Sequence, residues 1–595
     1  MHDATYRLPL ELGPGMGFDP RRPDLTLWCL EALHGLRGAQ RLAPTRISWA
    51  RLARVHDEAW LEALTHDEVV LGVFGLTAGR APADALLETL RRVTGGTVDG
   101  ALHVQRHGGH VLNLAGGFHH AFPDRGAGYC AVNDVAVAIR ALRDEGFRGR
   151  IGVFDLDAHP PDGTAACLRA MNPPVFIGSI SGSDWGPLPG VDETLLPEGA
   201  GNAPYLEALD ALLARAPRCE MAFVLAGGDV LAGDPLGRLG LDLAGTWQRD
   251  LRVARFLERT PSVWVTAGGY RPDAWRVAVG TWWALRFDTA PEIPRGFDPL
   301  ADHFRRVARS LPYASTGEPD DPNTLDFSDL EADLGLHRHR SARLLGYYTT
   351  AGLEVALHRY GLLEAVARLG YEDFRVELDD ASPGERLRLY ARAARTKEGA
   401  VTSEHLLVEV CVERQSREGL GAVLFVHWMT LRHPLGVFHP GRPCMPGQDV
   451  PGLGLAREAT ELLVRMAERL GLAGVVVRPA WFHVSWVGRA RFFCLDGAAQ
   501  GRFDALCRDL SAEPRLRRRG GSFALERASR AMAEGAVEVA VDGAPFVPWA
   551  WPAAEVCAPI RRSPPGDAWL VARDTARSAH RFRLRPDSPA DVTPG

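Results

Sequence analysis

The sequence predicts an α/β protein whose N-terminal half has a mostly parallel sheet with helices on both faces. Short apolar runs alternate with helical segments there, as where the helix-like VAVAIRALRDEGF (135–147) is followed by IGVFDLDAH (151–159). These runs are apolar almost throughout, which is typical of parallel strands buried on both faces. The repeated order of strand, loop and helix predicts such a sheet.

Length and composition predict more than one domain. A chain of 595 residues exceeds a single core, and 46% hydrophobic with 24% charged residues is typical of globular proteins. The composition changes at Tyr313–Asn323, YASTGEPDDPN, a stretch of turn-forming and acidic residues. We therefore expect four parts in this order: a first domain over 1–312, a linker over 313–333, an α/β or α+β domain over 334–577, and a flexible tail over 578–595.

The second half is less informative. Its pattern predicts a helix around 340–369, strands at 404–414 and 421–431, a helix over 453–471 and a strand at 474–478. Glycines in MPGQDVPGLGL (445–455) precede the last helix and could present N–H groups to a pyrophosphate. The stretch resembles the acyl-CoA loop of N-acetyltransferases, with Pro451 where that loop has glycine. We favour the interpretation that this stretch is an ordinary loop followed by the start of a helix.

Charge and cysteine content exclude several classes. A formal charge of −6 argues against a nucleic-acid-binding polycation. The nine cysteines are scattered without a CxxC pair, so neither a disulfide framework nor a thiolate zinc cluster is indicated. The acidic first 30 residues do not resemble a signal peptide, and no run of about 18 apolar residues could span a membrane. We expect a cytoplasmic protein without nucleic-acid or membrane partners.

Reactive side chains follow four of the apolar runs. Because the carboxyl ends of parallel strands meet at one edge of a sheet, where ligands collect, we expect these side chains to form one site. In chain order they are His119 and His120 after HVLNLAGGF, Asp155, Asp157 and His159 in VFDLDAH, Asp229 after LAGG, and Tyr270 after TAGG.

Three of these residues predict a metal site. Asp157 and His159 are two apart, so they point to the same side of an extended strand end, and Asp229 from another strand completes a set of three ligands. Three protein ligands with an open position are typical of a catalytic divalent metal. Carboxylate and imidazole ligands without thiolate suit zinc or iron, and manganese stays open.

The remaining residues predict acid–base chemistry. His119 and His120 lie at a strand end, and two carboxylates, Asp155 and Asp162, are left over after metal ligation. An aspartate bonded to one imidazole nitrogen fixes the tautomer and raises basicity, as a general base or acid requires. The phenol of Tyr270 is suited to donating to a developing oxyanion.

Several ordered motifs then identify a family. The stretches NLAGGFHHAFPDRGAGYCAVNDVAVAI (113–139), VFDLDAHPPDGTAA (153–166), LAGGDVLAGDPLGRLGL (225–241) and TAGGYRPDAWR (266–276) resemble the zinc-dependent histone deacetylase family. This family includes bacterial acetoin-utilisation-type proteins and acetylpolyamine amidohydrolases. The resemblance runs from about Tyr6 to Ala308. It implies an arginase-like fold, a mostly parallel eight-stranded sheet flanked by helices, and hydrolysis of acyl amides.

The resemblance also implies a role for each site residue. It implies zinc bound by Asp157, His159 and Asp229. His119 and His120 would be the base and acid pair, oriented by Asp155 and Asp162, while Tyr270 polarises the amide carbonyl. Substrate-contacting positions carried over from the family are Phe118, Gly128, Tyr129 and Leu236 along the acyl-lysine tunnel and Arg22 at the acetate exit. Asp155 and Ser179 match positions near a structural monovalent cation, usually potassium.

Two departures from the family pattern bear on function. Pro160 and Pro161 stand where the family has His or Gln followed by Gly, so the path to Asp162 and the potassium site depends on an altered loop. Leu236 stands where polyamine-selective relatives have a glutamate, which disfavours a cationic amine.

The leading prediction is a zinc-dependent deacylase of acyl-lysine amides in a peptide or protein. Three alternatives stay open. They are a deacylase of small acylated amines or metabolites, a catalytically weak acyl-lysine binding module, and an arginase-type hydrolase with two manganese ions.

Overall fold

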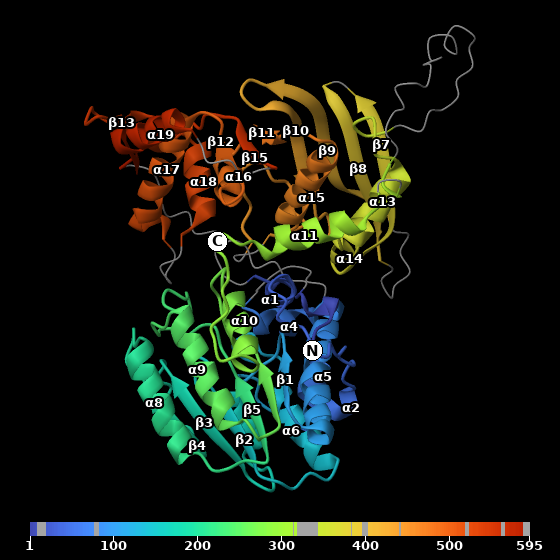
Figure 1. Cartoon of the computed structure of the whole chain (residues 1–595), viewed down its shortest axis with the longest axis vertical. Helices are drawn as coiled ribbons and strands as arrows, with labels where there is room; N and C mark the ends of the chain where they lie inside the picture. Colours follow the sequence, from blue (N-terminus) through green and yellow to red (C-terminus); the bar gives the residue numbers. More distant parts are fainter. Residues whose placement is uncertain are drawn as a thin grey trace. The chain divides into compact units, whose positions relative to one another are not determined.

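The chain forms two compact units in the computed structural model (Figure 1). The first runs from Met1 to Pro299, and the second takes up nearly all of the chain from Leu300 onward. The structure describes residues 1–8, 19–75, 83–312, 315–317, 343–381, 383–394, 403–438, 442–517, 523–560 and 566–586.

The first unit alternates strands and helices as the sequence predicts. Its elements are η1 (Ala4–Tyr6), α1 (Arg22–Ala32), α2 (Trp49–Leu52), α3 (Glu58–Ala63), α4 (Asp67–Val73), α5 (Ala83–His107), β1 (His110–Asn113), α6 (Asp134–Asp144), β2 (Ile151–Asp155), α7 (Asp162–Leu168), β3 (Val175–Ser181), β4 (Val191–Leu195), α8 (Asn202–Arg215), β5 (Met221–Leu225), α9 (Leu243–Phe256), β6 (Ser262–Val265) and α10 (Trp275–Ala284).

The six strands form one sheet in the order β1-β6-β5-β2-β3-β4, and every neighbouring pair is parallel. The predicted mostly parallel sheet flanked by helices is therefore confirmed. The described part of the chain supplies six strands to this sheet, whereas the resemblance implied eight. Beyond β1, Met1 donates its amine to the Leu112 carbonyl and accepts from the Leu114 N–H, so a single residue continues the pairing at that edge.

Each face of the sheet has its own core. Side chains alternate along the strands, so Val153 and Phe223 pack with α5 and α6 on one face, while Phe154 and Val224 pack with α8 and α9 on the other. All four side chains are fully buried. Burial on both faces explains why the sequences of the central strands β2 and β5 are almost entirely apolar.

The second unit contains two further sheets. Its elements are α11 (Pro299–Ser310), α13 (Thr350–Arg359), α14 (Leu362–Ala367), β7 (Tyr371–Ala381), β8 (Gly384–Ala393), β9 (Glu404–Arg417), β10 (Gly421–Leu431), α15 (Ala456–Arg469), β11 (Gly474–Val477), α16 (Phe482–Gly488), β12 (Phe493–Cys494), α17 (Gly497–Ala512), η3 (Pro514–Leu516), α18 (Leu525–Ala533), β13 (Val537–Val541), β14 (Val547–Pro548), β15 (Val556–Pro559), α19 (Asp567–Ala579) and β16 (His580–Leu584). A seven-stranded sheet has the order β12-β15-β11-β10-β9-β8-β7, and a small sheet has the order β14-β13-β16.

The second unit is an α/β or α+β domain, as predicted. β7 to β10 are antiparallel neighbours, and α15 connects β10 to the parallel β11. α15 begins directly after the glycine-containing stretch 445–455. That this stretch could bind a pyrophosphate stays a prediction. Of the predicted linker over 313–333, the structure describes only 315–317, and the rest lies outside the described residues. In the range predicted as a tail, β16 pairs with β13, and residues 587–595 are not described.

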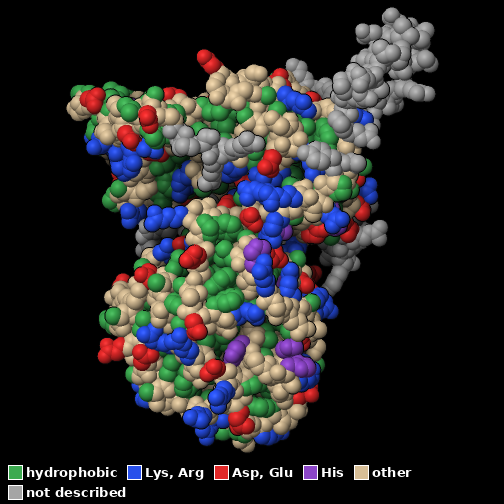
Figure 2. Space-filling view, in the orientation of Figure 1, with side chains coloured by type: hydrophobic (Ala, Val, Ile, Leu, Met, Phe, Trp, Pro, Cys, Tyr) green, Lys and Arg blue, Asp and Glu red, His purple; other side chains and the backbone are tan. Residues whose placement is uncertain are grey.

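Charge is mixed on the surface. Figure 2 shows Arg side chains interspersed with Asp and Glu over the visible face of the first unit. Among the described helices, none has the length and apolar character needed to cross a bilayer.

Candidate active site

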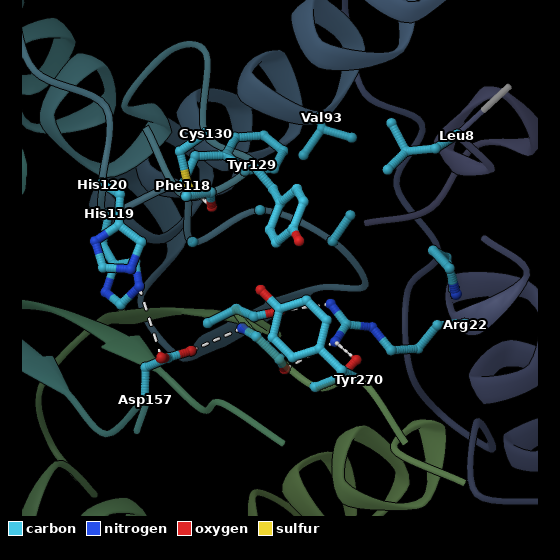
Figure 3. Close-up of a pocket in the computed structure, with 18 of the residues that line it drawn as sticks. Leu8, Arg22, Val93, Phe118, His119, His120, Tyr129, Cys130, Asp157 and Tyr270 are labelled. Carbon is cyan, nitrogen blue, oxygen red and sulfur yellow. Dashed lines mark hydrogen bonds and ion pairs between the residues drawn. The ribbon is translucent and has the colours of Figure 1, made fainter. Parts of the chain in front are cut away.

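The predicted site residues meet at the carboxyl ends of β1, β2, β5 and β6. A cavity of about 100 Å³ opens there, and its walls include His119, His120, Asp157, His159 and Tyr270. In Figure 3 the two histidines and Asp157 lie on one side of Tyr270, and Arg22, Leu8 and Val93 lie on the other. Strand ends from four parts of the chain thus supply one cavity, as their positions after apolar runs predict.

Asp157, His159 and Asp229 form a compact ligand set. One ligand atom from each lies within 4.8 Å of the others. Nδ1 of His159 is 3.1 Å from Oδ1 of Asp157 and 3.0 Å from Oδ2 of Asp229. Backbone N–H groups hold the second oxygens, since Gly268 donates to Oδ2 of Asp157 at 2.8 Å and Ala158 donates to Oδ1 of Asp229 at 3.1 Å. Both carboxylates are therefore oriented before any ligand binds.

The residues of this set fit a divalent metal. A Cβ on Gly227 would lie 2.7 Å from Oδ2 of Asp157, and one on Gly268 would lie 2.6 Å from Oδ2 of Asp229, so only glycine leaves room for the carboxylates. Two carboxylates and one imidazole are ligands that zinc accepts.

Electrostatics in the set favour a bound cation. Burial raises the pKa of Asp229 to about 7, and the charge of Asp157 adds to this effect. Burial opposes protonation of His159, but its bonds to Asp157 and Asp229 outweigh burial and raise its pKa to about 11. In the metal-free protein, the proton on His159 thus partly neutralises the negative charge of Asp157 and Asp229. A bound metal ion would neutralise the same charge.

The two neighbouring histidines each have a carboxylate partner. Nδ1 of His119 is 2.9 Å from Oδ2 of Asp155, and Nδ1 of His120 is 2.7 Å from Oδ1 of Asp162. The ring centroids of the histidines are 4.0 Å apart. Both Nε2 atoms are thereby left for other partners, and Nε2 of His119 lies 3.6 Å from Oδ1 of Asp157.

The two histidines differ in pKa. Burial disfavours a charge on His119, but Asp155 and Asp157 outweigh burial and raise its pKa to about 9. Burial lowers the pKa of His120 to about 4, helped by the charge on His119 and opposed by Asp162. Two titratable groups whose environments move their pKa values apart are typical of acid–base catalysis.

A buried aspartate shapes the loop that carries the pair. Asp134, the first residue of α6, accepts from the N–H groups of Gly117 and Phe118, at 2.8 Å for Phe118. Gly116 has φ +87° and Gly117 has φ +82°, a conformation that favours glycine. The AGGF sequence therefore turns tightly around Asp134 and delivers His119 and His120 to the cavity.

Tyr270 is held at its backbone. Its N–H donates to Oδ2 of Asp234 at 2.8 Å, and Arg22 donates to the carbonyls of Ala267 and Gly268 just before it. Burial raises the pKa of Tyr270 well above its ordinary value, so the phenol keeps its proton. Burial also lowers the pKa of Arg22.

Three of the predicted tunnel residues, Phe118, Gly128 and Tyr129, line the cavity together with Arg22. The ring of Tyr129 lies 5.8 Å from that of Tyr270. Leu236 does not belong to the residues that line this cavity. It is 40% exposed and donates its N–H to Asp234, the residue that also holds Tyr270.

Sequence reasoning missed Trp185. Its ring lies 5.1 Å from that of His120 and 5.8 Å from that of His159, yet the residue is 52% exposed. Trp185 therefore lies between the solvent and the rings of His120 and His159. It sits in the loop SGSDWGPLPG between β3 and β4, and the one available signal was an aromatic residue in a turn-rich segment after an apolar run.

Ser179 lies beside Asp155 in the pairing of β3 with β2. Its hydroxyl is buried and has no hydrogen-bond partner among the described residues. A buried oxygen without a partner is costly, so this position fits a bound monovalent cation.

The sequence of the first unit is similar to that of known proteins. Residues 17–285 match the model of the histone deacetylase domain. An uncharacterised protein of Picosynechococcus sp. is 35% identical over 233 residues, 36% of this chain and 76% of that protein. Histone deacetylase 2 of Arabidopsis thaliana is 30% identical over 250 residues, 39% of this chain and 64% of that protein. The acetoin utilization protein AcuC of Bacillus subtilis is 26% identical, over 44% of this chain and 75% of its own.

Among solved structures, a histone deacetylase homologue from Aquifex aeolicus matches with a TM-score of 0.40 and 24% identity, over 45% of this chain and 78% of its own. From the domain match and the relatives together, we conclude that this chain belongs, through residues 17–285, to the histone deacetylase family.

Proposed function

We propose that this chain is a zinc-dependent deacylase that hydrolyses acyl-lysine side-chain amides. The observation that carries the proposal is one cavity lined by His119, His120 and Tyr270 and by Asp157 and His159, which form a three-ligand set with Asp229. Each of the two neighbouring histidines has its own carboxylate partner, and the tyrosine is protonated. Each part supplies something that amide hydrolysis needs: a site for a Lewis acid, proton transfer in both directions and a donor to the oxyanion.

Asp157, His159 and Asp229 would hold the zinc ion. When bound, zinc supplies Lewis acidity, which lowers the pKa of water and polarises a carbonyl. The protein orients the two carboxylates through the N–H groups of Gly268 and Ala158, so little reorganisation accompanies metal binding.

The histidine pair moves protons. Asp155 accepts from Nδ1 of His119 and Asp162 accepts from Nδ1 of His120, so each Nε2 faces the reacting atoms. One imidazole takes the proton of the attacking water, and the pair returns a proton to the departing lysine nitrogen. Tyr270 donates its phenolic hydrogen to the oxygen that becomes negative as the carbonyl is attacked.

The cavity walls favour an aliphatic chain. Phe118 and Tyr129 offer aromatic surface, and Gly128 lets the backbone approach closely. Apolar walls suit the methylene stem of lysine, whose polar amide then reaches the site.

A potassium ion near Asp155 and Ser179 is part of the proposal, supported by the unpartnered Ser179 hydroxyl. We further propose that the protein works in the cytoplasm on a peptide or protein substrate. All nine cysteines are free thiols, which fits a reducing compartment.

Hydrolysis of a peptide panel tests the proposal. The full chain, loaded with one equivalent of zinc, is given peptides that differ only in the lysine acyl group, with acetylated polyamines in parallel. We expect release of free acid from acyl-lysine peptides, and no release by Asp157→Ala or His159→Ala. Turnover by either variant equal to that of the unchanged protein would sink the metal mechanism.

The peptide panel, together with peptide-binding measurements and metal analysis of the active protein, separates the alternatives. Preference for acylated polyamines or other small amides would identify a metabolite deacylase. Tight binding of acyl peptide without acid release would identify a binding module. Two manganese ions per chain in the active form would identify an arginase-type hydrolase.

A further inference from the structure

α9 contains a charged pair that the proposed chemistry does not use. Arg249 and Asp250 are both fully buried, and neither belongs to the residues that line the cavity. Arg249 contacts the backbone at the ends of β2 and β5, which carry the two carboxylates of the ligand set. A buried guanidinium is costly unless its hydrogen bonds compensate, so its contacts indicate what it does.

Arg249 joins two segments that carry metal ligands. Its Nη1 donates to the carbonyl of Leu156 at 3.1 Å and to the carbonyl of Gly227 at 2.7 Å. Leu156 lies between Asp155 and Asp157, and Gly227 lies two residues before Asp229. One side chain thus ties the end of β2 to the end of β5 next to both carboxylate ligands.

The spacing at this point is tight. A Cβ on Gly227 would lie 2.7 Å from Oδ2 of Asp157 and 2.8 Å from Oδ1 of Asp229. Tyr205 adds a hydroxyl that donates to the Leu156 carbonyl at 3.4 Å. A small displacement of either backbone segment would therefore change the separation of the two carboxylates directly.

Asp250 keeps the guanidinium charged and fixed. Nε of Arg249 donates to Oδ1 of Asp250 at 2.8 Å, and Thr281 of α10 donates to Oδ2 at 2.7 Å. Burial alone would lower the pKa of Arg249, but Asp250 outweighs burial and the pKa lies above its ordinary value. Buried ion pairs often add little to stability, whereas a planar guanidinium fixes the positions of its acceptors.

We propose that Arg249 is a positioning residue, which sets the separation of Asp157 and Asp229 for metal binding by tying together the backbones of Leu156 and Gly227. The inference rests on the proposed function only in that it takes Asp157, His159 and Asp229 as the metal ligands. It predicts that the side chain controls metal affinity without touching metal or substrate.

Zinc affinity of the full chain tests this inference. Arg249→Lys keeps the charge but replaces two separate nitrogens, Nη1 on the two carbonyls and Nε on Asp250, with a single ammonium, which cannot occupy both positions. We expect its zinc dissociation constant, measured by competition with a chromophoric chelator, to rise about 10- to 100-fold, the usual cost of losing a partner behind a metal site. The absorption spectrum of the cobalt-substituted protein should also change, because it reports the ligand geometry.

Asp250→Asn is the matched control. It removes the charge pairing but leaves Nη1 of Arg249 on both carbonyls, so we expect a lower unfolding temperature with unchanged zinc affinity and cobalt spectrum. All measurements are made well below the unfolding temperature of every variant. A merely structural role for Arg249 would lower stability in both variants and leave zinc affinity unchanged in both.

A second variant covers the case in which Arg249→Lys fails to fold. The double variant Arg249→Met/Asp250→Leu replaces the pair with apolar side chains, an exchange that is often neutral or stabilising. Zinc affinity equal to that of the unchanged protein in the folded variants overturns the inference. Absence of zinc binding and acyl-lysine hydrolysis in the unchanged protein is a different result, because it overturns the proposed function as well.

Discussion

Oδ1 of Asp162 lies 2.7 Å from Nδ1 of His120, although two prolines directly precede Asp162. Pro161 adopts φ −81° and ψ +58° and makes Asp162 the first residue of α7. There Oδ1 also accepts from the N–H of Gly163 at 2.8 Å. The altered loop therefore still delivers the carboxylate to the imidazole, which argues against a site weakened by the prolines.

Asp162→Asn should lower kcat/KM for an acyl-lysine peptide about 10- to 100-fold, the usual cost of losing an orienting partner in a metal site. Asp162 raises the pKa of His120, whereas burial lowers it. With the amide of asparagine in place of the carboxylate, the imidazole of His120 becomes less basic and is less well oriented. Zinc content should not change. Asp124→Asn, an exposed aspartate beside Arg125, is the control. Equal loss in both variants would contradict a specific role for Asp162.

Tyr270→Phe should lower kcat about 10²- to 10³-fold, as expected for the loss of one oxyanion donor. Because burial keeps the phenol protonated, the variant removes a hydrogen-bond donor without changing charge. Steady-state kinetics and zinc analysis measure the effect. Tyr129→Phe, whose ring lies 5.8 Å away, is the matched control and should retain most of kcat. A Tyr270→Phe enzyme with normal kcat would remove Tyr270 from the mechanism.

Gly128→Ala should abolish most activity while zinc stays bound. The added Cβ would lie 2.4 Å from Cδ2 of His120, which forces the imidazole out of place, and φ at this position is +51°. Gly108→Ala separates the two effects, because Gly108 has φ +70° and no atom within 4 Å of the added Cβ. We expect that control to lose some stability and no activity. Equal activity of the two variants would show that space at His120 is not limiting.

Local pattern was enough to predict part of this molecule. The apolar run before Asp155 identifies a buried strand, and the alternation of side chains at its end puts Asp157 and His159 on one side. Strand order and the number of strands do not follow from such runs. Pairing between strands is set by contacts between distant segments, such as that of Met1 with Leu112 and Leu114.

The same limit applies to the candidate site. Asp134, Trp185 and Arg249 act through residues far along the chain, and no spacing or motif connects them to their partners. Leu236, a position carried over from a family motif, lies outside the residues that line this cavity, so its contact with a substrate stays a prediction. The sequence predicts the candidate reacting side chains because they directly follow apolar strands. The residues that hold those side chains in place can be identified only from the three-dimensional structure.

Zinc binding to the metal-free protein should release protons. His159 has a pKa of about 11 and Asp229 one of about 7, so at pH 7 the first is protonated and the second is partly so. Both groups must lose their protons to bind the metal, so the affinity for zinc should rise with pH. For each proton released on binding, the affinity should rise about tenfold when the pH rises by one unit. Calorimetry in buffers of different ionisation enthalpy counts the protons. Zinc uptake without proton release would contradict His159 as a ligand.

His56 should make stability depend on pH. Its imidazole is 2% exposed, with Nδ1 donating to the carbonyl of Phe122 at 2.9 Å and Nε2 accepting from the N–H of Asn133 at 2.9 Å. Asn133 caps α6, and Phe122 lies two residues after His120, so this histidine holds the loop that carries His119 and His120. Burial lowers the pKa of His56 to about 4, from 6.5 in the unfolded chain.

Between these two pKa values the unfolded chain binds a proton that the folded protein excludes, so stability must fall as pH falls from 6.5 to 4. The shift corresponds to about 3 kcal/mol. Urea unfolding of the first unit at several pH values measures this against His56→Gln, whose amide can donate and accept without titrating. We expect the variant to be less stable near pH 7 and the difference to shrink or reverse near pH 4. Parallel pH profiles for the two proteins would show that folding does not shift the pKa of His56.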